Sequence, residues 1–320
     1  MVLNESGPDA GVAWHHGDPM GEQRALEAGR GAVDLHHRDV ITVSGPDRLT
    51  WLHSLTSQHL DQLAPGVGTT ALILSPNGHI EQVMYGVDDG ETFWAHTEPG
   101  AAPALVEFLD RMRFMSQVEV TDRSNSYGIV WRPGAPSATD VDHQLLTRRA
   151  EDSLGGYDVF TPLGDVASTL GDQPAGTWAY EALRIAAGVP RIGVDTDHRT
   201  IPNEAGLLGV GVHLDKGCYR GQETIARVHN IGRPPRRLVR LHLDGSVDQL
   251  PGVGDPLLLG DKQVGFVGSS ARHHELGPIA FGLVKRNTPT DKTLVTGEIA
   301  CAQEVLVDPE VGLHVKARLT

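Results

Sequence analysis

The feature that most constrains the fold is a change of pattern at Pro234–Pro235. Downstream of these prolines the chain has short Val- and Leu-rich runs separated by glycine: RLVRLHL, DPLLLG, KQVGFVGSS, IAFGLVKR and EVLVD. Short apolar runs between glycine turns are typical of antiparallel sheets that pack on or close on themselves. The sequence therefore predicts a domain boundary near 235, with a small antiparallel β-barrel or sandwich at 236–320.

Residues 1–235 mix helical and strand periodicity, which predicts an α+β region. A strand at 40–44 leads into a helix in GPDRLTWLHSLTS, and ALILSPNGHIEQVMYGV predicts a hairpin that turns at Pro76-Asn77-Gly78. AAPALVEFLDRMRFM and TWAYEALRIAAGVP predict amphipathic helices, whereas 131–176 is broken by Gly and Pro and predicts short strands and loops. Because one core usually serves no more than ~250–300 residues, the 320 residues predict two or three subdomains.

Charge and cysteine content exclude several classes of protein. The net charge of −14 argues against general DNA binding. A polyanion could bind only at a local basic patch. The two cysteines lack Cys-x-x-Cys or zinc-site spacing, so neither a disulfide framework nor a structural metal is indicated. The start, MVLNESGPDAG, has no signal-peptide pattern, and no window approaches the ~18 apolar residues of a membrane span. We therefore expect a cytoplasmic protein in a reducing compartment.

One of the two cysteines, Cys218, lies in the segment KGCYRGQETIAR at 216–227. The glycines on either side allow a tight bend, and QETIARVHN predicts a short helix whose N-terminus lies near the thiol. Lys216, Arg220 and Arg227 would favour the thiolate over the thiol, which would make Cys218 reactive. The alternative is a small buried hydrophobic residue, a common role for free cysteine.

The same segment begins a basic strip. Residues 216–240 hold seven Lys or Arg residues and a single acid, Glu223. Arginine grips carboxylates and phosphates with two parallel hydrogen bonds, so the strip predicts an anion site beside Cys218. Two other interpretations of the strip remain. It could be a solvated basic linker, or residues 233–240 could be a docking surface for an acidic partner or tRNA.

KGCYRGQETIAR resembles the signature of the YgfZ-like folate-binding proteins, which support iron–sulfur enzymes and are relatives of the glycine cleavage T-protein (aminomethyltransferase). The resemblance continues through VSGPDRLTWLHSLTSQHLDQLAPGVGTTALILSPNGHI, EALRIAAGVPRIGVDTDHRTIPNE, VGFVGSS and IAFGLVKR. It implies two interleaved α+β subdomains around a central opening, followed by a C-terminal antiparallel β-barrel. It also implies tetrahydrofolate, in polyglutamylated form or not, as cofactor. The implied role is assembly, repair or maintenance of iron–sulfur enzymes, including those that modify tRNA.

The resemblance carries specific residues. It implies catalytic or reactive roles for Cys218 and Lys216, and cofactor contacts for Tyr219, Gln222, Glu223, Arg227 and Glu204. With only two cysteines, an iron–sulfur cluster that needs about four thiolates would have to be shared with a client or assembly protein.

Two departures from the T-protein pattern argue against aminomethyl transfer. Where T-proteins carry paired aspartates after the hairpin glycine, this chain has Glu81 and Gln82, and where they carry a pterin-binding glutamate it has Ala186. Glu204 or Glu181 could replace that glutamate. The alternative function that remains open is a tetrahydrofolate-dependent one-carbon (aminomethyl) transferase. In it, Glu81 or Glu204 would handle the proton.

Histidine pairs at 15–16, 36–37 and 273–274 do not predict a metal site. Adjacent side chains point apart on helices and strands, and the spacings of known metal sites are missing, so we expect surface or loop histidines. GVGTT and GVGDP lack the context of a phosphate-binding loop and are interpreted as turns.

Overall fold

A computed structural model describes residues 1–136 and 145–311. Part of the segment 131–176, for which the sequence predicts short strands and loops, thus lies outside the described residues. The chain divides into two compact units. The N-terminal unit comprises Met1–Ile73 and Gln82–Tyr180, and the C-terminal unit comprises Leu74–Glu81 and Glu181–Thr320. The tip of the predicted hairpin therefore belongs to the C-terminal unit. The boundary near 235 stays a prediction.

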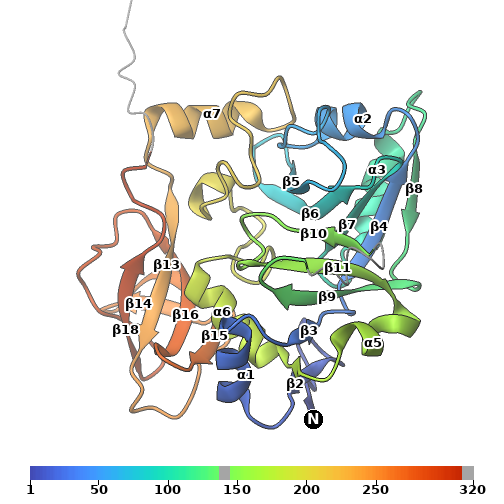
Figure 1. Ribbon diagram of the computed structural model, residues 1–320. Coiled ribbons are helices and arrows are strands. Elements are labelled where there is room, and N and C mark those ends of the chain that lie inside the picture. The colour runs from blue at the N-terminus through green and yellow to red at the C-terminus, as the bar shows by residue number, and fades with distance from the viewer. Residues whose placement is uncertain (137–144, 312–320) are drawn as a thin grey trace, which may run out of the picture. The chain divides into compact units, whose positions relative to one another are not determined.

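The N-terminal unit contains two five-stranded sheets whose strands interleave along the chain (Figure 1). The first has the order β5-β6-β7-β4-β8 and the second β10-β11-β9-β3-β12. Strand β3 (Ala32–Asp34) joins the second sheet, although β4 (Asp39–Ser44), which follows it directly, joins the first. The other strands are β5 (Gly68–Leu74), β6 (Ile80–Asp88), β7 (Thr92–Thr97), β8 (Glu119–Asp122), β9 (Tyr127–Pro133), β10 (Leu146–Arg148), β11 (Gly156–Pro162) and β12 (Pro174–Ala175).

Helices α2 (Arg48–Leu55) and α3 (Ala102–Met112) cover one face of the first sheet. Leu52 of α2 and Leu105 and Leu109 of α3 are fully buried in one cluster with Ile41 and Phe93 of the sheet. The i, i+4 spacing of the two α3 leucines is the helical stripe that the sequence predicts. Both helices and the hairpin of β5 and β6 are thus confirmed. The unit also contains a small β1–β2 sheet (Val2–Leu3, Ala13–His15), α1 (Pro19–Glu27), the 3-10 turn η1 (Leu163–Asp165) and α5 (Val166–Leu170), which was not predicted.

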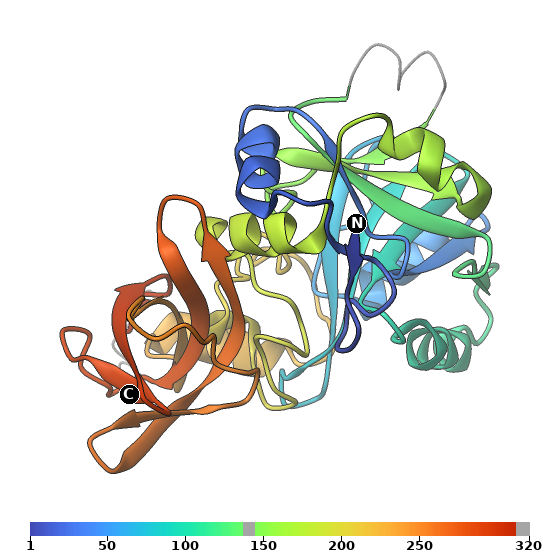
Figure 2. The same cartoon turned by 90° about the horizontal axis from the view of Figure 1, so that it is seen from below.

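The predicted C-terminal barrel is confirmed as a closed antiparallel barrel with the strand order β13-β16-β15-β14-β17-β18, drawn in orange to red in Figure 2. Pairing of β13 with β18 closes it. Val239, Leu257 and Cys301 are among the fully buried residues of its interior. The strands are β13 (Arg236–Leu243), β14 (Pro256–Leu259), β15 (Lys262–His273), β16 (Gly277–Lys285), β17 (Leu294–Thr296) and β18 (Ile299–Val305).

Three further elements precede the barrel: helix α6 (Thr177–Ala187), the 3-10 turn η2 (Pro202–Glu204) and helix α7 (Gln222–Ile231). The sequence predicts both helices, and both are confirmed. In the part of the chain that the structure describes, no helix has the length and apolarity needed to cross a membrane.

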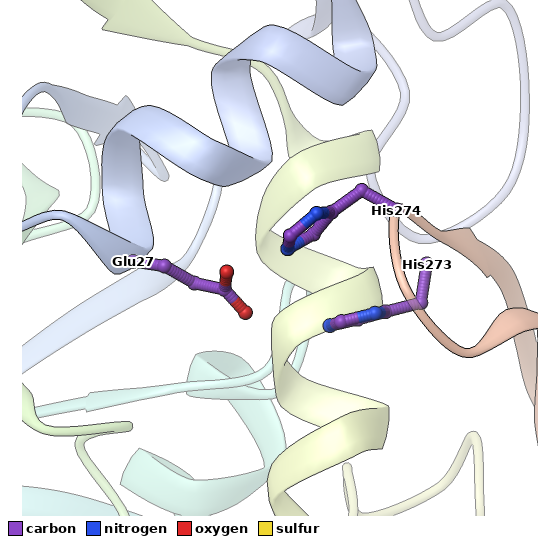
Figure 3. A group of neighbouring side chains, drawn as sticks. All are labelled: Glu27, His273 and His274. Carbon is purple, nitrogen blue, oxygen red and sulfur yellow. The ribbon is translucent and has the colours of Figure 1, made fainter.

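The side chains of the histidine pair 273–274 do not point apart as expected, and His273 is buried, although His274 lies in a turn. The two rings stack with their centroids 4.8 Å apart. Figure 3 draws both side chains together with Glu27, the last residue of α1. The alternation of a strand does not apply because His274 lies beyond the last strand residue. His273 is buried, and its Nδ1 accepts the backbone N–H groups of Glu275 and Leu276, so it stabilises the turn.

Candidate functional site

Helix α7 begins directly after residues 216–221, the loop that carries Cys218 and is called the cysteine loop below. Gly221, the residue before the helix, has φ +84°, a left-handed conformation that glycine adopts without strain. Ile225 in the first turns of α7 is buried and anchors the helix. The loop 216–221 is thus held at its C-terminal end by an apolar contact and by a bend that needs glycine.

The hairpin tip packs directly on this bend, within the C-terminal unit. A Cβ atom on Gly221 would lie 2.5 Å from the carbonyl oxygen of Ser75, and one on Gly78 would lie 3.0 Å from Cβ of Thr224. Arg220 adds an ion pair to Glu81, with 2.9 Å between nitrogen and oxygen. Two glycines therefore let two backbones touch, which fixes the cysteine loop against the turn between β5 and β6.

The residues around the thiol have different environments. Cys218 is exposed, whereas Lys216 is buried with its ammonium 5.2 Å from the centre of the Tyr219 ring. Burial raises the pKa of Tyr219 to about 12, so its hydroxyl stays protonated at neutral pH. The amide of Gln222 donates to the carbonyl of Lys216 at 3.5 Å, and Glu223 is exposed in the first turn of α7. The exposed thiol excludes the alternative of a buried structural cysteine at this position.

A cavity of about 660 Å³ lies beside α7, within the C-terminal unit, and Thr224, Arg227 and Val228 of this helix are part of its lining. Its wall contains Arg227 and Glu204, two of the predicted cofactor residues. The lining does not include the other predicted site residues, which are Lys216, Cys218, Tyr219, Gln222 and Glu223. The full lining is Asn77, His79, Asp197, Arg199, Ile201, Glu204, Thr224, Arg227, Val228, Pro235, Arg236 and Lys285.

Arg236 lines the cavity and binds two carboxylates. Its guanidinium donates to Glu204 at 2.9 Å and to Asp197 at 2.7 Å. Burial alone would lower the pKa of Arg236, but the hydrogen bonds to the two carboxylates outweigh it and raise the pKa. Burial likewise favours neutral Asp197, yet the hydrogen bonds from Arg236 and Thr200 hold the pKa of this carboxyl below its ordinary value.

Glu204 and Glu181, the two carboxylates that could replace the pterin-binding glutamate of T-proteins, both accept hydrogen bonds from arginines. Glu204 is buried, and its oxygens accept from Arg236 and from the backbone N–H of Ile201. Glu181 accepts from Arg184 at 2.6 Å and lies 3.5 Å from Arg191. A pterin bound by either residue would have to displace an arginine.

The basic strip is largely neutralised by acids that lie outside it in the sequence. Arg220, Arg233 and Arg240 pair with Glu81, Glu310 and Glu304, and Arg236 pairs with Asp197 and Glu204. Arg237 instead donates to backbone carbonyls at 285, 286 and 288. Within the described residues, Arg227 is the arginine of the strip without an ion pair or hydrogen bond, and it lines the cavity. Arg199 and Lys285, which the sequence analysis did not single out, add positive charge there.

A second buried polar cluster, in the N-terminal unit, also escaped the sequence analysis. Arg148 donates to Asp158 at 3.0 Å, and the same carboxylate lies 3.2 Å from Nε2 of His96. Burial lowers the pKa of His96, so the ring is neutral at neutral pH. Burial alone would raise the pKa of Asp158, but His96 and Arg148 outweigh it and keep the carboxyl ionised. The partners come from separate strands, so no local motif in the sequence could have indicated the cluster.

The fold matches a solved structure along nearly its whole length. Glycine cleavage system aminomethyltransferase T from Bartonella henselae superposes with a TM-score of 0.79 at 19% identity, covering 96% of this chain and 93% of that one. The chain therefore has the T-protein fold, a mixed α+β fold with a closed six-stranded antiparallel C-terminal barrel.

Sequence comparisons agree with the fold. A chloroplastic protein of Arabidopsis thaliana named as a transferase is 26% identical over 310 residues, covering 86% of this chain and 70% of the relative. A Natronomonas pharaonis protein named as an aminomethyltransferase is 29% identical, covering 69% and 70%. The mitochondrial iron–sulfur cluster assembly factor IBA57 homolog of Mycosarcoma maydis is 27% identical, covering 64% and 55%. No family model matches. At the level of the superfamily, the chain is aminomethyltransferase-like.

Proposed function

We propose that this protein binds tetrahydrofolate and supports the assembly, repair or maintenance of iron–sulfur enzymes, tRNA-modifying enzymes included, with Cys218 as its working thiol. The observation that carries the proposal is the exposed thiol on a glycine-fixed loop at the start of α7, a helix that also walls a cationic cavity. The similarity to an iron–sulfur cluster assembly factor supports the same assignment. This role belongs to the YgfZ-like branch that KGCYRGQETIAR resembles.

The cavity suits the acidic tail of the folate. Each glutamate unit of that tail carries a carboxylate, and Arg227, Arg199 and Lys285 supply positive charge in the lining. Arginine binds carboxylates with two parallel hydrogen bonds, so Arg227 is the residue that we expect to hold the tail. Polyglutamylated tetrahydrofolate would add further carboxylates to the same cavity. Tetrahydrofolate, when bound, supplies a nitrogen that carries one-carbon units.

The pterin end has no comparable partner among the residues that the sequence suggested. Glu204 and Glu181 both accept from arginines, and buried pterin donors left unpaired would cost about 1–3 kcal/mol each. We therefore propose the cavity for the tail alone, with Tyr219, Gln222 and Glu223 as candidate contacts nearer the cysteine loop.

Folate binding is tested by calorimetry under anaerobic conditions with mono- and polyglutamylated tetrahydrofolate. We expect saturable binding that Arg227→Ala weakens roughly tenfold or more, because a hydrogen bond to a charged group contributes about 1.5–3 kcal/mol. The matched control is Arg233→Ala, which removes an exposed, ion-paired arginine of the same strip and should leave the affinity unchanged. Wild-type protein that shows no saturable binding would reject the folate half of the proposal.

The role of the thiol is tested by complementation. Cells that lack the protein should regain iron–sulfur enzyme activity with the wild-type chain and with Cys301→Ala, but not with Cys218→Ala. The exposed position of Cys218 predicts that its replacement leaves thermal stability intact. Full complementation by Cys218→Ala would show that the thiol has no such role.

The second candidate is a tetrahydrofolate-dependent one-carbon transferase, because several relatives are named as aminomethyltransferases. Glu81, the acid proposed to handle the proton, is half-exposed and lies 2.9 Å from Arg220. Production of methylene- or formyl-tetrahydrofolate from a one-carbon donor, lost in Glu81→Gln, would support this candidate. No product with any donor would eliminate it.

A further inference from the structure

Two histidines and an aspartate of the N-terminal unit bring their donor atoms together at the end of α2. His53 lies in the last turn of that helix, and His59 and Asp61 lie in the loop that follows. Oδ1 of Asp61 lies 2.8 Å from Nε2 of His59 and 3.5 Å from Nδ1 of His53. The three side chains each offer one ligand atom, and these atoms all lie within 4.8 Å of one another.

The loop that carries these side chains is held rigidly. Leu52 and Leu60, each next to a histidine of the group, are fully buried in the core of the first sheet. Ser57 is tied to β5 in both directions: its backbone N–H donates to the carbonyl of Leu72 at 2.9 Å, and its hydroxyl accepts the N–H of Leu72 at 3.2 Å. A loop fixed on both sides of the donors preorganises them, which lowers the cost of binding a cation.

The hydrogen bonding in the group favours a cation. Nδ1 of His53 accepts the backbone N–H of Leu60 at 3.2 Å, so it faces the Asp61 carboxylate as a second acceptor. Two acceptors 3.5 Å apart repel each other unless a positive charge lies between them. A cation bound by Asp61 and His59 removes this repulsion. His53 can then complete the coordination by exchanging the Leu60 hydrogen bond for a metal bond.

The donor set selects the type of cation. Imidazole and carboxylate ligands suit zinc and related divalent transition metals, whereas calcium and magnesium prefer oxygen ligands alone. Zinc bonds of about 2.0–2.2 Å in tetrahedral geometry place neighbouring ligand atoms about 3.3 Å apart, and the two Asp61 distances lie on either side of this value. The side chains are 20%, 35% and 33% exposed, which leaves a fourth position open to water.

We propose that His53, His59 and Asp61 form a surface site for one divalent transition-metal ion of the zinc type, with three protein ligands and an open fourth position. The site lies in the N-terminal unit and uses none of the residues assigned to folate or to the working thiol.

The test is a titration of Zn²⁺ into chelator-treated, full-length protein by calorimetry, repeated with Co²⁺, whose visible absorption reports tetrahedral coordination. We expect one equivalent bound with an affinity that His59→Ala and Asp61→Asn each lower at least tenfold. Because the chain has 16 histidines, stoichiometry alone would not locate the ion. The matched control is His242→Ala, which removes a histidine paired with a single carboxylate, Glu304, at 2.8 Å, and should bind Zn²⁺ like wild type.

Asp61→Asn keeps the size of the side chain, and circular dichroism verifies that the variants are folded. Wild-type protein without saturable Zn²⁺ binding would overturn the proposal. The same conclusion would follow if both variants bound Zn²⁺ as tightly as wild type, or if Co²⁺ gave the spectrum of the hydrated ion.

Discussion

The barrel interior and the region around α7 belong to the same unit but are stabilised by different interactions. In the barrel, Cys301 is fully buried among residues such as Val239, Leu257 and Leu294, so apolar burial dominates. Around α7, Cys218 is exposed, and the neighbouring structure depends on ion pairs and on contact between two glycines. The comparison indicates that the barrel is the stable support, whereas the α7 region presents charge and a thiol to solvent.

The largest expected difference concerns the two thiols. In native protein at about pH 8, a thiol reagent should label Cys218 and spare Cys301. The buried thiol becomes accessible only on unfolding, so its labelling should be at least about 10³-fold slower. Mass spectrometry of the two cysteine peptides over time measures this ratio. Labelling of both cysteines at similar rates would show that the barrel interior opens far more readily than its packing indicates.

The next largest effect concerns Arg236, the first residue of β13, which joins the barrel to the cavity wall. Arg236→Met should lower the free energy of unfolding by about 3–5 kcal/mol, because it leaves buried Glu204 without its counter-ion. Urea unfolding followed by circular dichroism measures the change.

The control for Arg236→Met is Arg233→Met. The ion pair between Arg233 and Glu310 is more than half exposed at both ends, so its loss should lower the free energy of unfolding by at most about 1 kcal/mol. Equal losses in the two variants would contradict the view that buried charge pairing stabilises the cavity wall.

The fold was largely predictable because its signals are local. Leu105 and Leu109 have helical spacing, Pro76-Asn77-Gly78 marks a hairpin turn, and the barrel strands have their own apolar runs. The short helix α5 was missed because Gly and Pro on either side of it suggested only loops.

The site was less predictable because its charges are set by distant partners. The sequence suggested a strongly cationic strip, but Glu81, Glu304 and Glu310 neutralise three of its arginines, and none of these acids lies within the strip. The group of His53, His59 and Asp61 was missed because its spacing matches no known metal motif. Only the fold of the loop brings these donors together.

A smaller effect should follow from adding one methyl group to the cysteine loop. Gly221→Ala forces a left-handed conformation on alanine and brings its Cβ within 2.5 Å of the Ser75 carbonyl oxygen, so we expect a loss of about 1–3 kcal/mol. Gly217→Ala in the same loop is the matched control, because its Cβ would meet no atom within 4 Å and its φ is not in the left-handed region. If both variants unfold at the same urea concentration, contact between the two backbones does not hold the loop.

The last effect concerns the buried thiol of the barrel, which makes the free energy of unfolding depend on pH. Burial raises the pKa of Cys301 to about 11, so the native state keeps this thiol protonated where the unfolded chain, with an ordinary value of about 8.5, loses the proton. A raised pKa in the folded state contributes stability that is fully present below about pH 8.5 and is lost as the pH rises toward 11. Between these values wild type should therefore lose stability faster than Cys301→Ala, by up to about 1.4 kcal/mol per pH unit. Parallel curves for wild type and Cys301→Ala would mean that the barrel thiol contacts water, and the contrast between the two regions would then rest on the α7 charges alone.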